Sequence, residues 1–400
     1  MYQNKLLWGT TTKRTFPILT ETIEADYLIV GGGISGLAAA YFLSHHRQKR
    51  IVLVEKHTIG SGSTGHSAGM LAHEPEHAGW DELLITHGSK ATKAYYQAHV
   101  KATKLVKQII KEAQIDCDFD EHEYLHLSPD EAPARSTFYQ AYRCINQTLD
   151  ASVDFLDAKA LQKEFTTAKY KAAKRTQKHN FSVNPLKFAR GFAQYLAQTK
   201  HITIFEHTTV KKVRNGVATT ETGAIRFKHI IYCRGTHEVR PDLIPYLATI
   251  GVTRKLTKKE LKVIGLHDKD MFEDEPRGGS FHYGKVTRDN RLLIGYGDKP
   301  VSPKKFTYPV YRPHLKVIEQ FLKQTFPTLH IPVAYAWSAP YALTTQELPI
   351  VELKTDTELY LNGAGLQIGC IAAAAYGVSK LLKKPHPLDT VYLSHDYETA

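Results

Sequence analysis

Two short apolar runs near the N-terminus each end in a polar loop, with an alanine-rich segment between them. The first run, residues 27–30, ends in Gly31-Gly-Gly-Ile-Ser-Gly36, and the alanine-rich stretch that follows is typical of a buried helix. The second run, residues 51–54, ends in Glu55. This order predicts strand, glycine turn, helix, strand and acid, which is the βαβ unit of a dinucleotide-binding fold.

The rest of the chain alternates between helical and extended patterns of apolar residues. Apolar positions at helical spacing predict further helices over residues 82–113, 132–149, 184–197, 313–325 and 370–382. Alternating or continuous apolar runs predict strands over residues 117–127, 202–207, 210–213, 229–235 and 358–361. A hairpin turn is expected at Asn215-Gly216, and residues 250–300 alternate like an antiparallel sheet.

The glycines of the first turn have separable physical roles. Gly31 permits a tight turn, Gly33 lets the backbone approach a pyrophosphate, and Gly36 lets the helix pack closely on its strand. The helix N-terminus adds free N–H groups and partial positive charge. The carboxylate of Glu55 can accept hydrogen bonds from ribose hydroxyls and would repel a 2′-phosphate. A turn without a ligand is the alternative, but it leaves the flanking strands and the acid unexplained.

A second loop of small residues follows the acid directly. Residues 56–70 consist mainly of Gly, Ser and Thr, whereas an NAD-binding fold continues straight into its next helix and strand. Backbone N–H groups of such a loop can lie along a ribityl chain and a flavin ring. We therefore expect FAD as the cofactor, because a flexible linker would not explain why the loop stands after Glu55.

These segments resemble the D-amino-acid-oxidase-like family of FAD-dependent oxidoreductases, which includes glycine and sarcosine oxidases. In that family a Gly-x-Ser-x-Gly-x-x-x-Gly loop follows the ribose acid. The resemblance places Thr208-Thr-Val210 at the adenine, Tyr232-Cys-Arg-Gly235 beneath the FAD, and Gly363-x-Gly365 at the last flavin loop. Trp8 with Pro17, and the segment from Tyr283 to Gly295, are similar to the gamma-glutamylputrescine-oxidase-like branch.

The resemblance implies an α/β fold in which an FAD-binding Rossmann-like domain of the glutathione-reductase type is joined to a second domain. That second, substrate domain is expected to be α+β and built on an antiparallel sheet. Because the FAD motifs stand in three separated stretches, the FAD domain is expected to be discontinuous. The expected ranges are a lead-in at 1–23, an FAD domain at 24–80, 180–240 and 330–385, a substrate domain at 81–179 and 241–329, and a tail at 386–400.

The motifs and the resemblance together define the residues expected to contact FAD. They are Gly31, Gly33, Ile34, Ser35, Gly36, Glu55, Lys56, Ser63, Thr64, His66, Ser67, Ala68, Gly69, Met70, Val210, Cys233, Gly235, Gly363, Gly365, Leu366, Gln367 and Ile368. The helix after the last loop is expected to point its N-terminus at the flavin and to stabilise negative charge there.

Enzymes of this family oxidise a C–N bond by hydride transfer from the carbon beside the amine to flavin N5, after which the imine hydrolyses. The cofactor carries this chemistry, so no metal is expected. The resemblance implies a substrate face that includes the following residues, each of which could instead pack in the sheet or face solvent: Tyr283, His282, Lys285 and Gln367, with Tyr296 and Tyr341 as further candidates.

The chain departs from the family pattern at two points. Amino-acid-specific members often carry an arginine or lysine near the last glycine loop, whereas residues 366–370 contain no cation, which disfavours a simple α-amino acid. Monomeric sarcosine oxidases place a lysine beside N5, and the matching residues 292–294 are apolar. Oxidase and dehydrogenase activity both remain open, with oxygen or another group as electron acceptor.

The sequence His66-Ser-Ala-Gly69 has the spacing of a loop in the dimethylglycine and sarcosine dehydrogenases of this family. There a histidine is covalently bound to the 8α-methyl group of the flavin. The resemblance implies either such a bond at His66 or a histidine that only hydrogen-bonds the ring.

Composition narrows the class of protein. The 400 residues are 42% hydrophobic and 23% charged, as in ordinary globular proteins. No uncharged apolar stretch reaches the roughly 18 residues of a membrane span. The four cysteines are scattered and form no C-x-x-C pair, so neither a zinc site nor a disulfide framework is indicated, and the cytoplasm is the expected compartment.

The net charge keeps a second class of partner open. The chain has 52 basic and 40 acidic residues, a formal charge of +12, which fits solvated lysines or an anionic partner. The leading hypothesis is an FAD-dependent oxidoreductase acting on a small amine or amino acid. The alternatives are an FAD-dependent enzyme that removes a glycine-like adduct from wobble uridine in tRNA, and a flavin-holding assembly factor without catalysis.

Overall fold

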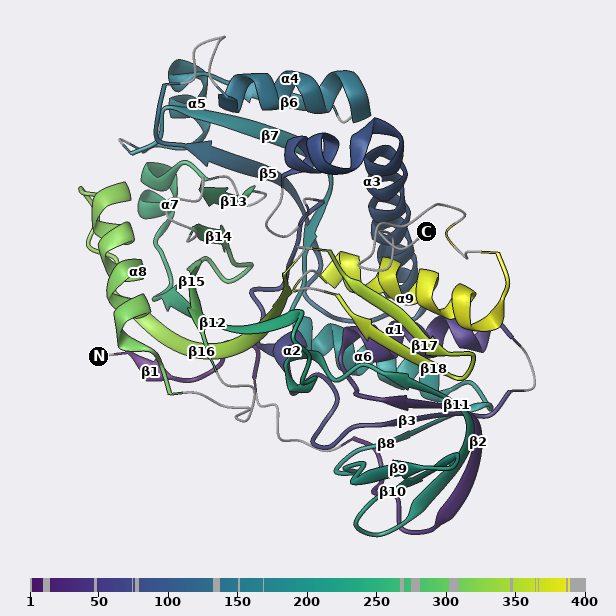
Figure 1. Cartoon of the computed structure of the whole chain (residues 1–400). Coiled ribbons are helices and arrows are strands. Elements are labelled where there is room, and N and C mark those ends of the chain that lie inside the picture. Colours follow the sequence, from purple (N-terminus) through teal and green to yellow (C-terminus); the bar gives the residue numbers. More distant parts are fainter. Residues whose placement is uncertain are drawn as a thin grey trace.

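The computed structural model describes residues 2–9, 15–46, 49–73, 75, 79–131, 137–149, 152–167, 169–266, 270–274, 281–301, 309–345, 348–363, 365, 367–385 and 388, without the side chains of Asp298 and Gln367. Within these ranges the strands form one sheet of eight strands and one of ten. Figure 1 shows the eight-stranded sheet at the lower right and the ten-stranded sheet extending from the lower left to the top.

The eight-stranded sheet has a parallel centre. Its strand order is β17 (Ile350–Thr355), β18 (Glu358–Asn362), β11 (Ala224–Tyr232), β2 (Thr22–Val30), β3 (Ile51–Val54) and β8 (Ile202–Phe205). Val30 pairs with both Val54 and Tyr232, so these three strands end at the same edge. All of β3 is buried, which explains its continuous apolar run. The hairpin β9 (Lys212–Arg214) and β10 (Val217–Thr219) extends β11.

Four helices form a layer beside this sheet (Figure 1). They are α1 (Ile34–Ser44), α3 (Trp80–Glu112), α6 (Pro185–Ala197) and α9 (Gln367–Leu382). The side chain of Asn184 accepts a hydrogen bond from the N–H of Lys187, and Pro185 is the first helical residue, so α6 begins as its sequence predicts. α3 is kinked at Gly88, which has a positive φ of 75°.

The ten-stranded sheet is mostly antiparallel. Its order is β1 (Gln3–Asn4), β16 (Val333–Thr344), β12 (Leu243–Thr253), β15 (Leu292–Pro300), β14 (His282–Val286), β13 (Asp270–Asp274), β5 (Asp120–Ser128), β7 (Ala172–Ser182) and β4 (Met70–Leu71), with β6 (Val153–Leu156) paired to β7. Only the β1–β16 and β13–β5 pairs of these described strands are parallel. The helices on the side of this sheet are α4 (Thr137–Leu149), α5 (Ala158–Glu164), α7 (Lys258–Ile264) and α8 (Arg312–Thr325). Of these, α8 packs on β12 and β15.

Several element boundaries differ from the sequence-based expectations. The last helix begins at Gln367 rather than at residue 370, and β9 begins at Lys212, so residues 210 and 211 form loop. The helix expected over 132–149 is described from Thr137, and residues 132–136 lie outside the described residues. The pattern did not predict β6, β7 or α5. In β7 the middle of the strand is polar and partly exposed, which hides the alternation.

The division into domains stays a proposal, and the strand order bears on it at two places. β4 and β16 both fall in ranges assigned to the FAD domain, but both belong to the ten-stranded sheet. β4 directly follows the second small-residue loop in the chain.

Candidate active site

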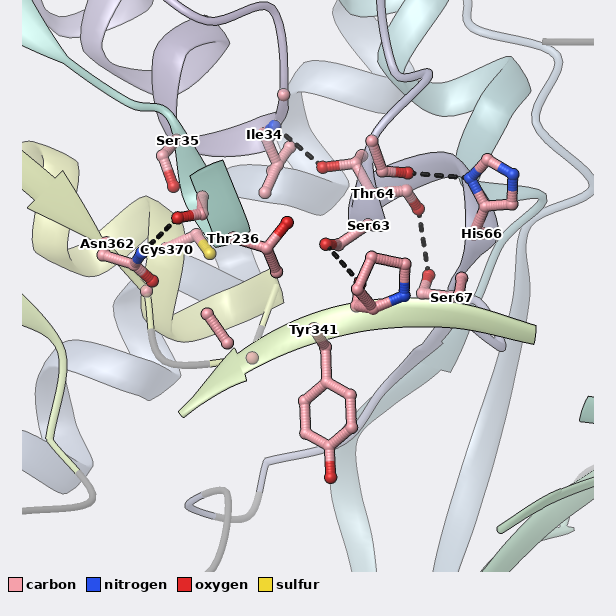
Figure 2. Close-up of a pocket in the computed structure, with 18 of the residues that line it drawn as sticks. Ile34, Ser35, Ser63, Thr64, His66, Ser67, Thr236, Tyr341, Asn362 and Cys370 are labelled. Atoms are coloured by element: carbon pink, nitrogen blue, oxygen red, sulfur yellow. Dashed lines mark hydrogen bonds between the residues drawn. The ribbon is translucent and has the colours of Figure 1, made fainter. Parts of the chain in front are cut away.

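A cavity of about 490 Å³ is lined by residues of both sheets. Figure 2 shows Ser63, Thr64 and His66 of the second loop on one side and the strand with Tyr341 running past them. Most residues expected to contact FAD line this cavity: Gly31, Gly33, Ile34, Ser35, Glu55, Lys56, Ser63, Thr64, His66, Ser67, Ala68, Met70, Val210, Cys233, Gly235, Gly363 and Gly365. Gly36, Gly69 and Ile368 do not, and Leu366 and the side chain of Gln367 lie outside the described part.

Two glycines of the first turn are required by the packing of the protein itself, whereas the third has free space on its cavity side. Gly31 has a φ of 121°, and a Cβ there would lie 2.2 Å from the carbonyl oxygen of Cys233. A Cβ at Gly36 would lie 2.0 Å from the carbonyl oxygen of Gly31, so this residue is needed for helix–strand packing. At Gly33 only the Thr64 hydroxyl, at 3.2 Å, comes within 4 Å, which leaves the cavity side open.

Glu55 directly follows β3 and lines the cavity. Its Oε2 accepts a hydrogen bond from the N–H of Gly32 at 2.8 Å, and its Oε1 accepts one from the N–H of His57 at 2.9 Å. Burial raises the pKa of Glu55, and these two N–H donors oppose that rise. A carboxylate has about four acceptor positions, so lone pairs remain for ribose hydroxyls.

The two glycine loops are joined by hydrogen bonds. The N–H of Ile34, at the start of α1, donates to the Thr64 hydroxyl at 3.1 Å (Figure 2). Thr64 belongs to α2 (Ser63–His66), a single helical turn within the second loop. The Ser63 hydroxyl donates to the carbonyl of Pro340 on β16 at 2.7 Å, which fixes this turn against the ten-stranded sheet.

His66 is held in one tautomer. Its Nδ1 lies 2.9 Å from the carbonyl oxygen of Gly62, an atom that only accepts, so Nδ1 carries the proton. Burial lowers the pKa of His66, which favours the neutral ring with a lone pair on Nε2. Two indoles fix the adjoining backbone: Trp337 Nε1 donates to the His66 carbonyl at 2.9 Å, and Trp8 Nε1 donates to that of Ser67 at 2.8 Å.

A buried acid that the sequence reasoning missed supports the second loop. The Oε1 of Glu206 accepts a hydrogen bond from the N–H of Ile59 at 2.7 Å, and its Oε2 accepts one from Phe16 at 2.9 Å. Glu206 is 0% exposed, and it joins the lead-in to the start of the loop. No sequence pattern marks a single glutamate after a strand as a residue that holds a loop in place.

Successive side chains of β14 point to opposite faces of the sheet, so the residues expected to form the substrate face do not all lie on one side. Tyr283 lines the cavity, as does Tyr341, whereas His282 points to the opposite face, where its Nδ1 lies 3.0 Å from Asp274. Lys285 shares the face of Tyr283 but does not line the cavity; it is 4% exposed and lies 5.7 Å from the Trp8 ring. Burial lowers the pKa of Lys285 to about 7. Tyr296 does not line the cavity either.

Other cavity residues could not have been found from a motif. They include Tyr124, Ile250, Glu273, Phe281 and Trp337. Tyr124 and Glu273 reach the site because β5 and β13 pair in parallel across a long sequence separation.

The family model of FAD-dependent oxidoreductases (DAO) matches residues 26–377 of this chain. The chain belongs to this family. It is 25% identical to a gamma-glutamylputrescine oxidoreductase of Escherichia coli over 384 residues, which cover 92% of this chain and 86% of that one. It is also 25% identical to a putative Rieske 2Fe-2S iron-sulfur protein of Bacillus subtilis over 405 residues, covering 96% and 74% of the two chains. The glycine oxidase of Geobacillus kaustophilus has the same fold, with a TM-score of 0.72, 19% identity, and coverage of 90% and 95%.

Membership confirms the predicted family, the α/β fold, the oxidoreductase class and FAD as the cofactor. The cavity fits FAD, because the open side of Gly33, the carboxylate of Glu55 and the backbone of the second loop border one continuous space. In the part of the chain that the structure describes, no group of three metal-binding side chains occurs, and no helix is long and apolar enough to cross a membrane.

Proposed function

We propose that this protein oxidises the C–N bond of a small amine or amino acid at the inner end of the cavity. When bound, FAD supplies the hydride acceptor. The observation that carries the proposal is the direct continuity of the FAD-fitting loops with an aromatic pocket formed by Tyr124, Phe281, Tyr283, Trp337 and Tyr341. Such a pocket can hold a substrate C–H bond against the ring and exclude water that would compete.

The protein side chains would bind and orient the substrate and would not form a covalent bond to it. Tyr283, which lines the cavity, would position the neutral amine, and the aromatic walls would keep the reacting carbon dry. The N-terminus of α9, beside the cavity residues Gly363, Gly365 and Cys370, offers backbone N–H groups and partial positive charge that would stabilise negative charge on the bound cofactor.

The test is an anaerobic screen of amines and amino acids against the purified, FAD-loaded protein. Loss of the oxidised-flavin absorbance with at least one substrate, and release of the matching aldehyde or keto acid, is the expected result. Retention of the oxidised spectrum with every amine and amino acid would instead favour the flavin-holding alternative. The tRNA alternative would require retention on tRNA that weakens steeply with salt.

A further inference from the structure

The pocket end of the cavity carries a single charged side chain among the lining residues that the structure describes. The other lysine, arginine and carboxylate groups at the wall, Lys56, Arg234 and Glu55, stand on the cofactor-binding loops, and Arg234 forms a two-point ion pair with Glu238. Glu273 is the exception. It lies on β13 directly opposite Tyr283 of β14.

The Glu273 side chain has the properties of a cation-binding carboxylate. Burial raises the pKa of Glu273, but hydrogen bonds from His126 and Tyr124 outweigh burial and hold the pKa below its ordinary value. Its Oε1 lies 3.0 Å from Nδ1 of His126, and the side chain is 18% exposed. Within the described ranges no lysine or arginine forms an ion pair with Glu273, although the charge of Lys174 also helps to lower its pKa. Glu273 lines the cavity, and a carboxylate has about four acceptor positions.

Glu273 also stands at the junction with a second cavity of about 220 Å³. Pro75, Glu273 and Phe281 line both spaces, so the two cavities adjoin at this carboxylate. The charged and titratable groups on the second wall are Asp81, Glu82, His126, Lys174, Glu273 and Asp274. Asp274 is already paired with Lys169 at 3.1 Å and with His282 at 3.0 Å, and Lys174 lies 4.8 Å from the Phe138 ring.

We propose that Glu273 is a specificity-determining residue that binds a second, non-reacting ammonium group of the substrate. The substrate class is then a diamine or a longer cationic amine. An α-amino acid would instead place its carboxylate near Glu273, where like charges repel. This inference rests on the proposed function, since it names the substrate class of the same site.

The experiment compares amines of equal length that differ only at the far end: diaminobutane, butylamine and gamma-aminobutanoate. Anaerobic flavin reduction at several concentrations gives the half-saturating concentration separately from the limiting rate. The wild-type protein is expected to bind diaminobutane about tenfold more tightly than butylamine, with gamma-aminobutanoate weakest. Glu273→Gln should reduce this preference to within about twofold, mainly through the half-saturating concentration.

Two further variants separate charge from folding. Glu273→Asp keeps the charge and should retain part of the preference, whereas Glu121→Gln removes an exposed carboxylate of β5 that pairs with Lys107 and should retain all of it. FAD content and thermal unfolding are measured for each variant. A wild-type protein that reduces its flavin equally well with butylamine or gamma-aminobutanoate overturns the role of Glu273 while the proposed function stands.

A binding measurement tests the same site without turnover. Diaminobutane is titrated into the oxidised holoprotein, and the shift of the flavin spectrum is recorded. If no amine or amino acid of the anaerobic screen reduces the flavin, the proposed function fails. Glu273 still stands as a cation-binding residue if the wild-type spectrum responds to diaminobutane and that of Glu273→Gln does not. An equal response of both proteins contradicts the inference.

Discussion

The ring of Tyr283 lies directly on Gly295, its cross-strand partner between β14 and β15. A Cβ built at Gly295 would lie 2.1 Å from Cζ of that ring and 2.5 Å from its hydroxyl oxygen. Only glycine therefore leaves the ring where it is. The position of the Tyr283 ring at the cavity wall therefore depends on the absence of a side chain at Gly295.

Gly295→Ala should displace this ring. We expect the substitution to destabilise the holoprotein by roughly 1–3 kcal/mol, as overpacking does, and to slow flavin reduction by substrate. Denaturant unfolding and anaerobic reduction measure the two effects. In a Tyr283→Ala background the same change should cost clearly less, because the clashing ring is gone. Equal costs in both backgrounds would show that the contact is not the cause.

Gly33→Val should abolish FAD binding, because its methyl groups would occupy the side of the turn where the pyrophosphate approaches. The apoprotein should still fold, since only the Thr64 hydroxyl lies within 4 Å of a Cβ at this position. Gly36→Ala is the contrasting variant, and it should lower the unfolding temperature of the apoprotein itself. Flavin content and thermal unfolding of both apoproteins check this. A yellow Gly33→Val protein with full FAD content would contradict the prediction.

His66 can be tested for a covalent bond to the flavin. Its Nδ1 hydrogen bond to Gly62 leaves Nε2 with the lone pair that attack on the 8α-methyl group requires. If the bond forms, acid denaturation leaves the yellow colour in the protein precipitate, and His66→Ala releases it to the supernatant. Colour that leaves the unaltered protein shows instead that His66 only hydrogen-bonds the cofactor.

The buried Lys285 should make stability depend on pH. Burial lowers the pKa of Lys285 to about 7 from an ordinary value of 10.5, so the native protein binds fewer protons than the unfolded chain between these values. Stability contributed by this residue therefore rises with pH across this window, and below it the full cost of a buried charge persists.

Lys285→Met should accordingly raise the unfolding temperature most below about pH 7, with a gain that shrinks as the pH approaches 10.5. Thermal unfolding across this range measures the gain. Lys259→Met, at an exposed position of α7, is the matched control for loss of a lysine. A gain that stays constant from low to high pH would mean that the burial of Lys285 is not its source.

Local motifs were enough to predict most of the loop residues that line the cavity, because each motif is short and contiguous. Gly31, Gly33 and Glu55 lie within one βαβ unit, and the second loop follows the acid directly. Their geometry is set by turn chemistry and by the pairing of neighbouring strands. The contact between Ile34 and Thr64 is a consequence of these motifs that the sequence alone does not specify.

The residues of the substrate face could not all be predicted, because their positions depend on strand pairings between distant parts of the chain. Glu273 reaches the pocket only because β13 pairs with β5 in parallel and with β14 in antiparallel. Alternation along β14 could have separated His282 from Tyr283, since neighbouring residues of a strand face opposite sides. Both residues were expected on the substrate face, whereas His282 lies beside Asp274 and does not line the cavity.

The indole of Trp8 binds the carbonyl of Ser67, and the strand just before it pairs with β16. The N-terminal segment and the cofactor site thus share one loop, and if both stabilise the same loop conformation, linkage requires each to raise the affinity of the protein for the other by the same factor. Protease attack on the segment around Trp8 should slow when FAD is bound. A chain cut between Trp8 and β2 would in turn lose FAD faster well before its sheets come apart.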